Sequence, residues 1–185
     1  MKLLGVTQVA EAAALLVGSA TGTPPRRGRL WAIDCEAFYR RVGRQRGELW
    51  RNAVCLPQGW RLDERCCFGD ASAAVKCTRI SDFLSVQIKK ELLAFDERHP
   101  SRDPVWLAWQ AERCAAAAAR GASAQEAAAE ASLNWFGLYI DDGTGASADD
   151  LLYDAEGVAV VTDTGEHMRR ATAHFDYIST LRRPC

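Results

Sequence analysis

Residues 135–145 of this chain are Trp-Phe-Gly-Leu-Tyr-Ile-Asp-Asp-Gly-Thr-Gly. The largely apolar run from Trp135 to Ile140 predicts a short buried β-strand. Two carboxylates, Asp141 and Asp142, follow at the end of that strand. An Asp-Asp-Gly sequence after a strand most often forms a solvent-exposed turn, so its interpretation depends on a second stretch with the same layout.

The second stretch is Leu30-Trp-Ala-Ile33, which predicts another buried strand with Asp34 at its end. A carboxylate at the end of a strand is held by a rigid element and still reaches solvent. Mg²⁺ (or Mn²⁺) binds few protein carboxylates and completes its coordination with water and phosphate oxygens. We expect one sheet to bring Asp34 and Asp141 together around a pair of ions, which would suit phosphoryl transfer. The alternative for Asp34 is a helix cap.

Between these two stretches the sequence predicts helices and one hairpin. Apolar residues follow helical spacing over residues 70–95, and an alanine-rich region predicts two further helices within residues 96–133. Pro57-Gln58-Gly59 predicts a hairpin turn between two β-leaning segments, residues 49–56 and 60–68.

The end of the chain adds a strand over residues 158–161 and a last helix through Tyr177. Asp163 and Glu166 have the spacing of a capping box before that helix. This order of elements favours an α+β fold in which helices pack on a sheet. A short amphipathic helix and a basic loop are expected within residues 1–29, ahead of one domain over residues 30–185.

The composition of the chain excludes several classes of protein. A length of 185 residues allows one domain with a real core, and a net charge of −1 gives no overall attraction to nucleic acid. Seven cysteines, with no Cys-x-x-Cys pair, argue against a disulfide framework and a zinc site, and favour an intracellular location, cytoplasmic or nuclear. No stretch approaches the ~20 apolar residues of a membrane span, so we expect no membrane partner.

Three motifs resemble those of reverse transcriptases. Leu138-Tyr-Ile-Asp-Asp142 resembles the Tyr-x-Asp-Asp signature, in which two aspartates lie at the tip of a hairpin in the palm domain. Ala32-Ile-Asp-Cys-Glu-Ala-Phe-Tyr39 is similar to the first palm motif, an aspartate followed five positions later by an aromatic residue. Phe68-Gly-Asp-Ala-Ser72 is similar to the middle motif of DIRS-like retrotransposons of the tyrosine-recombinase type, whereas Leu56-Pro-Gln-Gly59 is interpreted as a turn.

The resemblance implies an RNA-directed DNA polymerase that acts on an RNA or DNA template-primer and a dNTP. It implies metal ligation by the carboxylates of Asp34, Asp141 and Asp142 and by the backbone carbonyl of Cys35. Other residues would bind substrate: Tyr39 under the incoming sugar, and Phe68, Gly69 and Ser72 at the nucleotide and template. Arg40 and Arg41 could contact template, primer or triphosphate, and a solvated surface is the alternative.

The resemblance also implies a palm-like antiparallel sheet packed against helices. Residues 96–133 would be a helical insertion and residues 1–29 a remnant of the fingers. We therefore expect a fragment of the polymerase, whose further subdomains are encoded outside this chain. Two other hypotheses stay open. One is a catalytically inactive palm-like module that binds nucleic acid or protein, and the other is an unrelated intracellular α+β interaction domain in which Asp141-Asp142 is a turn.

Overall fold

The computed structural model describes residues 27–35, 38–44, 46–47, 49, 53–66, 71–139 and 142–181, together with Ala10 and Ala14. For Tyr39, Arg40, Ala71, Tyr139 and Leu181 it describes the backbone alone. Most of the helix and basic loop expected within residues 1–29 lies outside this range; Ala10 and Ala14 are helical, and residues 28–29 belong to the first strand.

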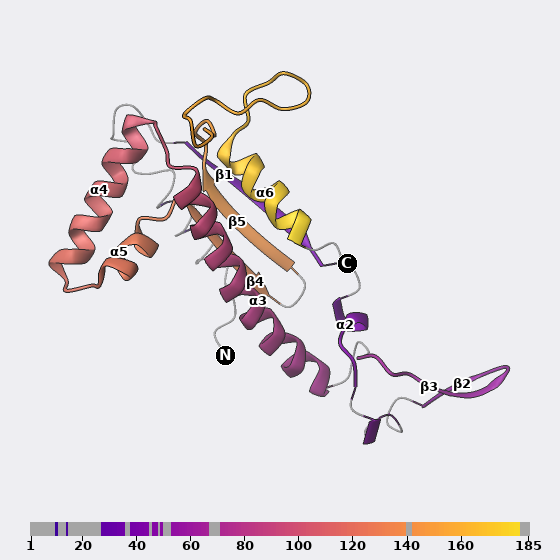
Figure 1. Cartoon of the computed structure of the whole chain (residues 1–185). Helices are drawn as coiled ribbons and strands as arrows, with labels where there is room; N and C mark the ends of the chain where they lie inside the picture. Colours follow the sequence, from indigo (N-terminus) through magenta and orange to yellow (C-terminus); the bar gives the residue numbers. More distant parts are fainter. Residues whose placement is uncertain are drawn as a thin grey trace.

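A three-stranded antiparallel sheet forms the centre of the molecule (Figure 1). Its strand order is β1 (Gly28–Asp34), β5 (Asp142–Ala148) and β4 (Asn134–Tyr139). Tyr139 is the Cα partner of Asp142, so β4 and β5 are consecutive strands joined through residues 140–141. Helices pack on this sheet, and the prediction of an α+β fold is confirmed.

The glycines of the central strand β5 leave room for large side chains of the two neighbouring strands. Trp31 of β1 and Phe136 of β4 are both Cα partners of Gly145, and their rings stack over it with centroids 5.7 Å apart. A Cβ atom at Gly145 would overlap the Trp31 ring, and one at Gly143 would overlap the Ile33 side chain. The small residues of β5 therefore let the large residues of both neighbouring strands meet across it.

Two helices cover one face of the sheet. α3 (Ala71–Arg98) packs on β4, and α6 (Arg170–Leu181) packs on β1 and β5. Between them lies an apolar core whose buried members are Ile33, Leu92, Phe136, Leu138 and Ile178. The long helix predicted over residues 70–95 is confirmed and runs three residues further.

The two helices predicted in the alanine-rich region are also confirmed, as α4 (Pro104–Ala119) and α5 (Ala124–Glu130). Asp103 caps α4 by accepting a hydrogen bond from the Val105 amide at 2.8 Å, and a capping box at Ser123 begins α5. Both tryptophans of α4 are buried, and they pack with Leu133, Ala146 and Ala148.

The predicted capping box at Asp163 and Glu166 is wrong. The Glu166 amide donates to the Thr162 hydroxyl at 3.2 Å, and the Glu166 carbonyl accepts from the Thr162 amide at 2.7 Å, which closes a turn. The last helix begins four residues later, at Arg170. The strand predicted over residues 158–161 contributes only isolated bridges, through Ala159 and Val161.

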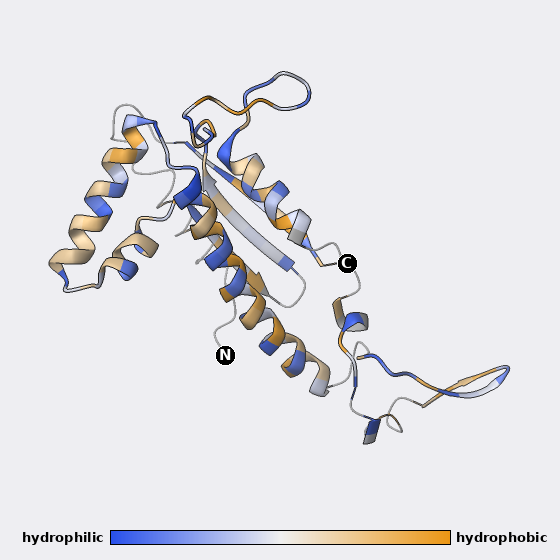
Figure 2. Cartoon of the chain, in the orientation of Figure 1, coloured by the Kyte–Doolittle hydropathy of each residue, from blue (hydrophilic) through white to orange (hydrophobic). Residues whose placement is uncertain are grey.

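A hairpin forms an arm beyond the end of the sheet, after the short helix α2 (Phe38–Arg41). Its strands are β2 (Ala53–Leu56) and β3 (Gly59–Leu62), and Gly59 has a φ of +108°, as the predicted turn requires. The strands are shorter than the segments predicted for them. Figure 2 shows apolar residues along this hairpin although all residues of both strands are exposed.

Candidate metal centre

Asp34 and Asp142 lie side by side at one end of the sheet. Asp34 is the last residue of β1 and Asp142 the first of β5, and their Cα atoms are direct partners in the antiparallel register. Side chains at directly opposite positions of such a pair have Cβ atoms about 4.5–5.5 Å apart. Both residues are exposed. The sheet therefore brings together two carboxylates from distant parts of the sequence where they can share a ligand.

These carboxylates lie on the face of the sheet that α3 and α6 leave uncovered. Residues of a strand alternate between the two faces, so Asp34 shares its face with the exposed Ala32, while Ile33 points into the helical core. The tryptophans of α4 cover this face only toward its far end, near Ala146 and Ala148. Among the described residues, the core that packs on this face thus lies away from Asp34 and Asp142.

Two exposed carboxylates at adjacent positions fit a divalent cation. Mg²⁺ and Mn²⁺ prefer oxygen ligands, and Mg²⁺ is commonly held by one or two carboxylates together with water and phosphate oxygens. Asp141, the neighbour of Asp142, lies outside the described residues. Within the residues that are described, no group of three His, Cys, Asp or Glu side chains is arranged to hold a metal.

The contact predicted between Asp34 and Asp141 involves a residue outside the described range. The described partner of Asp34 is Asp142, and the position of Asp141 stays a prediction. Phe68 and Gly69 also lie outside the described residues, as do the side chains of Tyr39 and Arg40. Their proposed contacts with substrate stay predictions too.

Two further members of the predicted site are Cys35, directly after β1, and Arg41, the last residue of α2. The Cys35 carbonyl accepts a hydrogen bond from the Phe38 amide at 3.1 Å. Phe38 is buried against Cys77 and belongs to the core. Ser72 lies in the first turn of α3, where the middle motif was expected.

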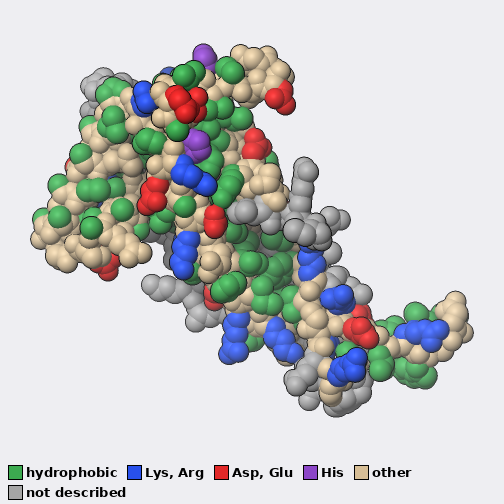
Figure 3. Space-filling view, viewed as in Figure 1, with side chains coloured by type: hydrophobic (Ala, Val, Ile, Leu, Met, Phe, Trp, Pro, Cys, Tyr) green, Lys and Arg blue, Asp and Glu red, His purple; other side chains and the backbone are tan. Residues whose placement is uncertain are grey.

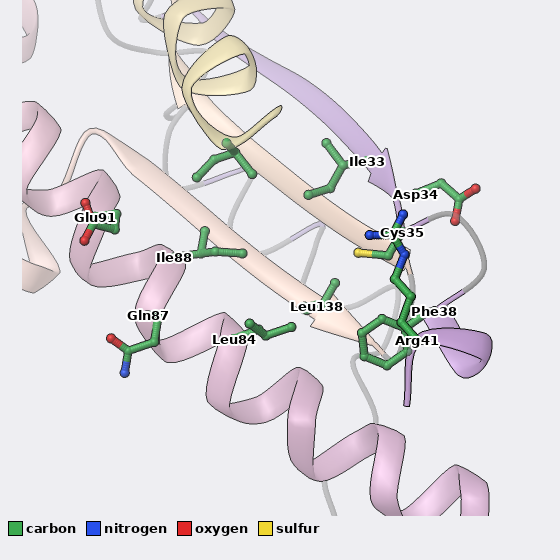
Figure 4. Close-up of a pocket in the computed structure, with 11 residues that line it drawn as sticks. Ile33, Asp34, Cys35, Phe38, Arg41, Leu84, Gln87, Ile88, Glu91 and Leu138 are labelled. Atoms are coloured by element: carbon green, nitrogen blue, oxygen red, sulfur yellow. The ribbon is translucent and has the colours of Figure 1, made fainter. Parts of the chain in front are cut away.

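Sequence reasoning missed a cavity of about 560 Å³ between α3 and the helical face of the sheet (Figure 4). Leu84 and Ile88 of α3, Leu138 of β4 and Ile178 of α6 give it apolar walls. Its polar lining residues are Asp34, Arg41, Gln87 and Glu91. Figure 4 shows the Asp34 carboxylate turned away from the other labelled residues of this cavity.

Sequence reasoning also missed a buried ion network around Arg170. This side chain is fully buried and donates to both carboxylate oxygens of Asp150, from Nε at 2.7 Å and from Nη2 at 3.2 Å. Its Nη1 donates to Asp96 at 2.6 Å and to the His99 carbonyl at 2.7 Å. Burial lowers the pKa of Arg170, but the hydrogen bonds and charges of Asp150 and Asp96 outweigh this effect and raise it.

Asp96 connects this network to the sheet. Besides Arg170, it accepts the Asn134 side-chain amide at 2.7 Å and lies 3.0 Å from His174 Nε2. Burial alone would raise the pKa of Asp96. The hydrogen bond and charge of His174, the charge of Arg170 and the Asn134 hydrogen bond together hold that pKa below its ordinary value, so the carboxylate stays ionised.

Three side chains in contact resemble the nucleophile, base and acid of a hydrolase triad. In space their order is Ser147, His174, Asp96. His174 Nδ1 is 2.8 Å from Ser147 Oγ, and the Trp31 indole donates to the same oxygen at 2.9 Å. Both Ser147 and His174 have no exposed surface, so a substrate has no access to the hydroxyl. We therefore interpret these residues as a structural link between α3, α6 and β5.

Comparisons with protein-family models, with curated proteins and with solved structures found no match to this chain. Over the described part of the chain, no helix combines the length and apolar character needed to cross a membrane. What indicates a function in this chain is therefore the position of Asp34 and Asp142 in the sheet.

Proposed function

We propose that this chain is the palm core of an RNA-directed DNA polymerase, which transfers a nucleotide from a dNTP to the 3′-hydroxyl of a primer. The observation that carries this proposal is the pairing of Asp34 with Asp142. Asp34 comes from the segment that resembles the first palm motif. Asp142 comes from the segment that resembles Tyr-x-Asp-Asp, and it lies at the end of a hairpin, as the reverse transcriptase signature requires.

In this proposal Asp34, Asp142 and Asp141 would hold Mg²⁺ (or Mn²⁺), with the carbonyl of Cys35 as a further ligand. Bound there, the cation would supply Lewis-acid stabilisation of the phosphoryl group and would lower the pKa of a bound hydroxyl. The contribution of the protein is rigidity. Paired strands fix the two carboxylates, and the helical core behind them keeps the sheet in place.

The face of the sheet that carries Asp34 and Asp142 would receive the template-primer, RNA or DNA. Tyr39, on the helix that follows Asp34, would pack under the sugar of the dNTP. Phe68, Gly69 and Ser72 would contact nucleotide and template. Arg40 and Arg41 would offer positive charge to the triphosphate. Further polymerase subdomains encoded outside this chain would complete the grip on the duplex, in an intracellular setting.

The test is primer extension on poly(rA)·oligo(dT) with dTTP and Mg²⁺ or Mn²⁺, combined with Mn²⁺ binding measured by electron paramagnetic resonance. Asp34→Asn and Asp142→Asn should each abolish extension and weaken Mn²⁺ binding, because each removes a charged ligand. Asp163→Asn is the matched control, since Asp163 is an exposed acid in the turn before α6. It should leave both readouts unchanged.

Three outcomes separate the hypotheses. Full extension by either of the two site variants would contradict the proposal. Mn²⁺ binding that depends on Asp34 and Asp142 without extension would favour the catalytically inactive palm-like module. Wild-type protein that neither extends a primer nor binds Mn²⁺ would leave the unrelated α+β interaction domain.

A further inference from the structure

The β2–β3 hairpin exposes more apolar surface than an isolated hairpin sustains. Its exposed side chains include Val54 at 46%, Leu56 at 44%, Trp60 at 69% and Leu62 at 55%. Two strands alone are marginally stable in water and need packing on a further surface. Contiguous exposed apolar residues commonly mark a binding site. This hairpin therefore has the properties of a surface that a partner covers.

The register of the hairpin sorts these side chains between its two faces. Cys55 is the Cα partner of Trp60 and Ala53 that of Leu62, so these four share one face. Arg61 is the partner of Val54 and lies on the other face. Strand β3 therefore presents the exposed Trp60 indole on one face and the exposed Arg61 guanidinium on the other.

The charge of the surrounding segment indicates what kind of partner this is. Residues 38–90 contain eleven of the 23 Lys and Arg residues but only five of the 24 Asp and Glu residues. The rest of the chain contains 12 basic and 19 acidic residues, so the near-zero total charge is the sum of a basic segment and an acidic remainder. Figure 3 shows Lys and Arg side chains gathered over the lower end of α3, α2 and the arm.

The base of the arm is fixed to this basic region. Gly43, two residues after α2, forms an antiparallel bridge with Arg65. The Arg44 amide donates to the Glu64 carbonyl at 2.9 Å, and the Cys66 amide donates to the Val42 carbonyl at 2.9 Å. The hairpin is therefore anchored close to α2, on the side of the molecule where β1 ends in Asp34.

A polyanion that presents flat apolar rings matches this surface better than a protein partner does. Proteins that bind single strands combine a positively charged surface with aromatic side chains on which bases stack. We propose that the β2–β3 hairpin binds single-stranded RNA or DNA, with a base stacked on the Trp60 indole and with phosphates attracted by Arg61 and the basic segment around it. This inference rests on the proposed function for its identification of that strand as the template.

The test is binding of a fluorescein-labelled oligo(U) or oligo(dT) 20-mer, followed by fluorescence anisotropy in EDTA so that the metal centre does not contribute. Trp60→Ala should weaken binding by about 5- to 150-fold, the range that loss of one base stack produces. Trp60→Phe should restore binding to within a few fold and remove the quenching of tryptophan fluorescence by the oligonucleotide. Arg61→Ala should make the negative slope of log K against log salt shallower by about 0.7.

Val158→Ala is the matched control, because Val158 is 62% exposed and lies outside the basic segment. It should leave binding unchanged. Because this binding is measured in EDTA and without a dNTP, a failure of primer extension would leave its result intact. Equal binding by Trp60→Ala and wild type would overturn the inference. An absence of oligonucleotide binding by wild type would overturn it as well. A change of oligomeric state in Trp60→Ala would then assign the hairpin to a protein partner.

Discussion

Replacing Arg170 by Met should destabilise the fold by several kcal/mol. The change keeps a long unbranched side chain but removes four hydrogen bonds, two to Asp150, one to Asp96 and one to the His99 carbonyl. It leaves both carboxylates buried without their cation, and breaking a buried pair in this way costs about 3–5 kcal/mol. With a urea slope of ~2 kcal/mol/M, the unfolding midpoint should fall by ~2 M.

Urea unfolding followed by tryptophan fluorescence at pH 7 measures this effect. Arg169→Met is the matched control at the neighbouring position. Its side chain is 42% exposed, and it lies 3.6 Å from Asp149, so its replacement should cost at most about 1 kcal/mol. Equal midpoints for the two variants would refute the view that the network around Arg170 holds α6 on the sheet.

Two further predictions concern the same core. Because the pKa of Asp96 is depressed in the folded state, its contribution to stability is present above the ordinary value of 3.8 and is lost as the pH falls below it. Urea midpoints between pH 7 and pH 3 should therefore fall less steeply in Asp96→Asn, and parallel curves would contradict this. Gly145→Ala should lower stability by about 1–3 kcal/mol, because the added Cβ meets the Trp31 ring. Gly47→Ala, where a Cβ meets nothing, is its control in the same thermal melts, and equal melting temperatures would argue against the packing of Trp31 over β5.

Local signals in the sequence predicted much of the fold. Apolar residues at helical spacing were enough for α3, and the Pro57-Gln58-Gly59 turn was enough for the hairpin, because both depend on residues that are close in sequence. Two apolar runs, each followed by an aspartate, predicted the strands β1 and β4. They placed Asp34 and the Asp141-Asp142 pair at strand ends, although the pairing of Asp34 with Asp142 rather than Asp141 depends on the register of β5.

Features that depend on distant partners were missed. The contact of Trp31 with Phe136 across the glycines of β5 joins strands that are far apart in the sequence, so spacing alone could not predict it. Arg170 and His174 are four residues apart on one face of α6, which is a detectable signal of a polar helix face. Their partner Asp96 is more than 70 residues away, so spacing alone could not show that this face is buried. The capping box at Asp163 failed because the same spacing also suits a turn.

The most direct test of the central claim is a crystal structure of the protein soaked in Mn²⁺, with the ion located by its anomalous scattering. The proposal predicts an Mn²⁺ ion bound by carboxylate oxygens of both Asp34 and Asp142, at distances of about 2.0–2.3 Å as for other small oxygen-bound divalent ions. Carboxylates that point to opposite faces of the sheet, or an ion bound only elsewhere on the chain, would contradict it.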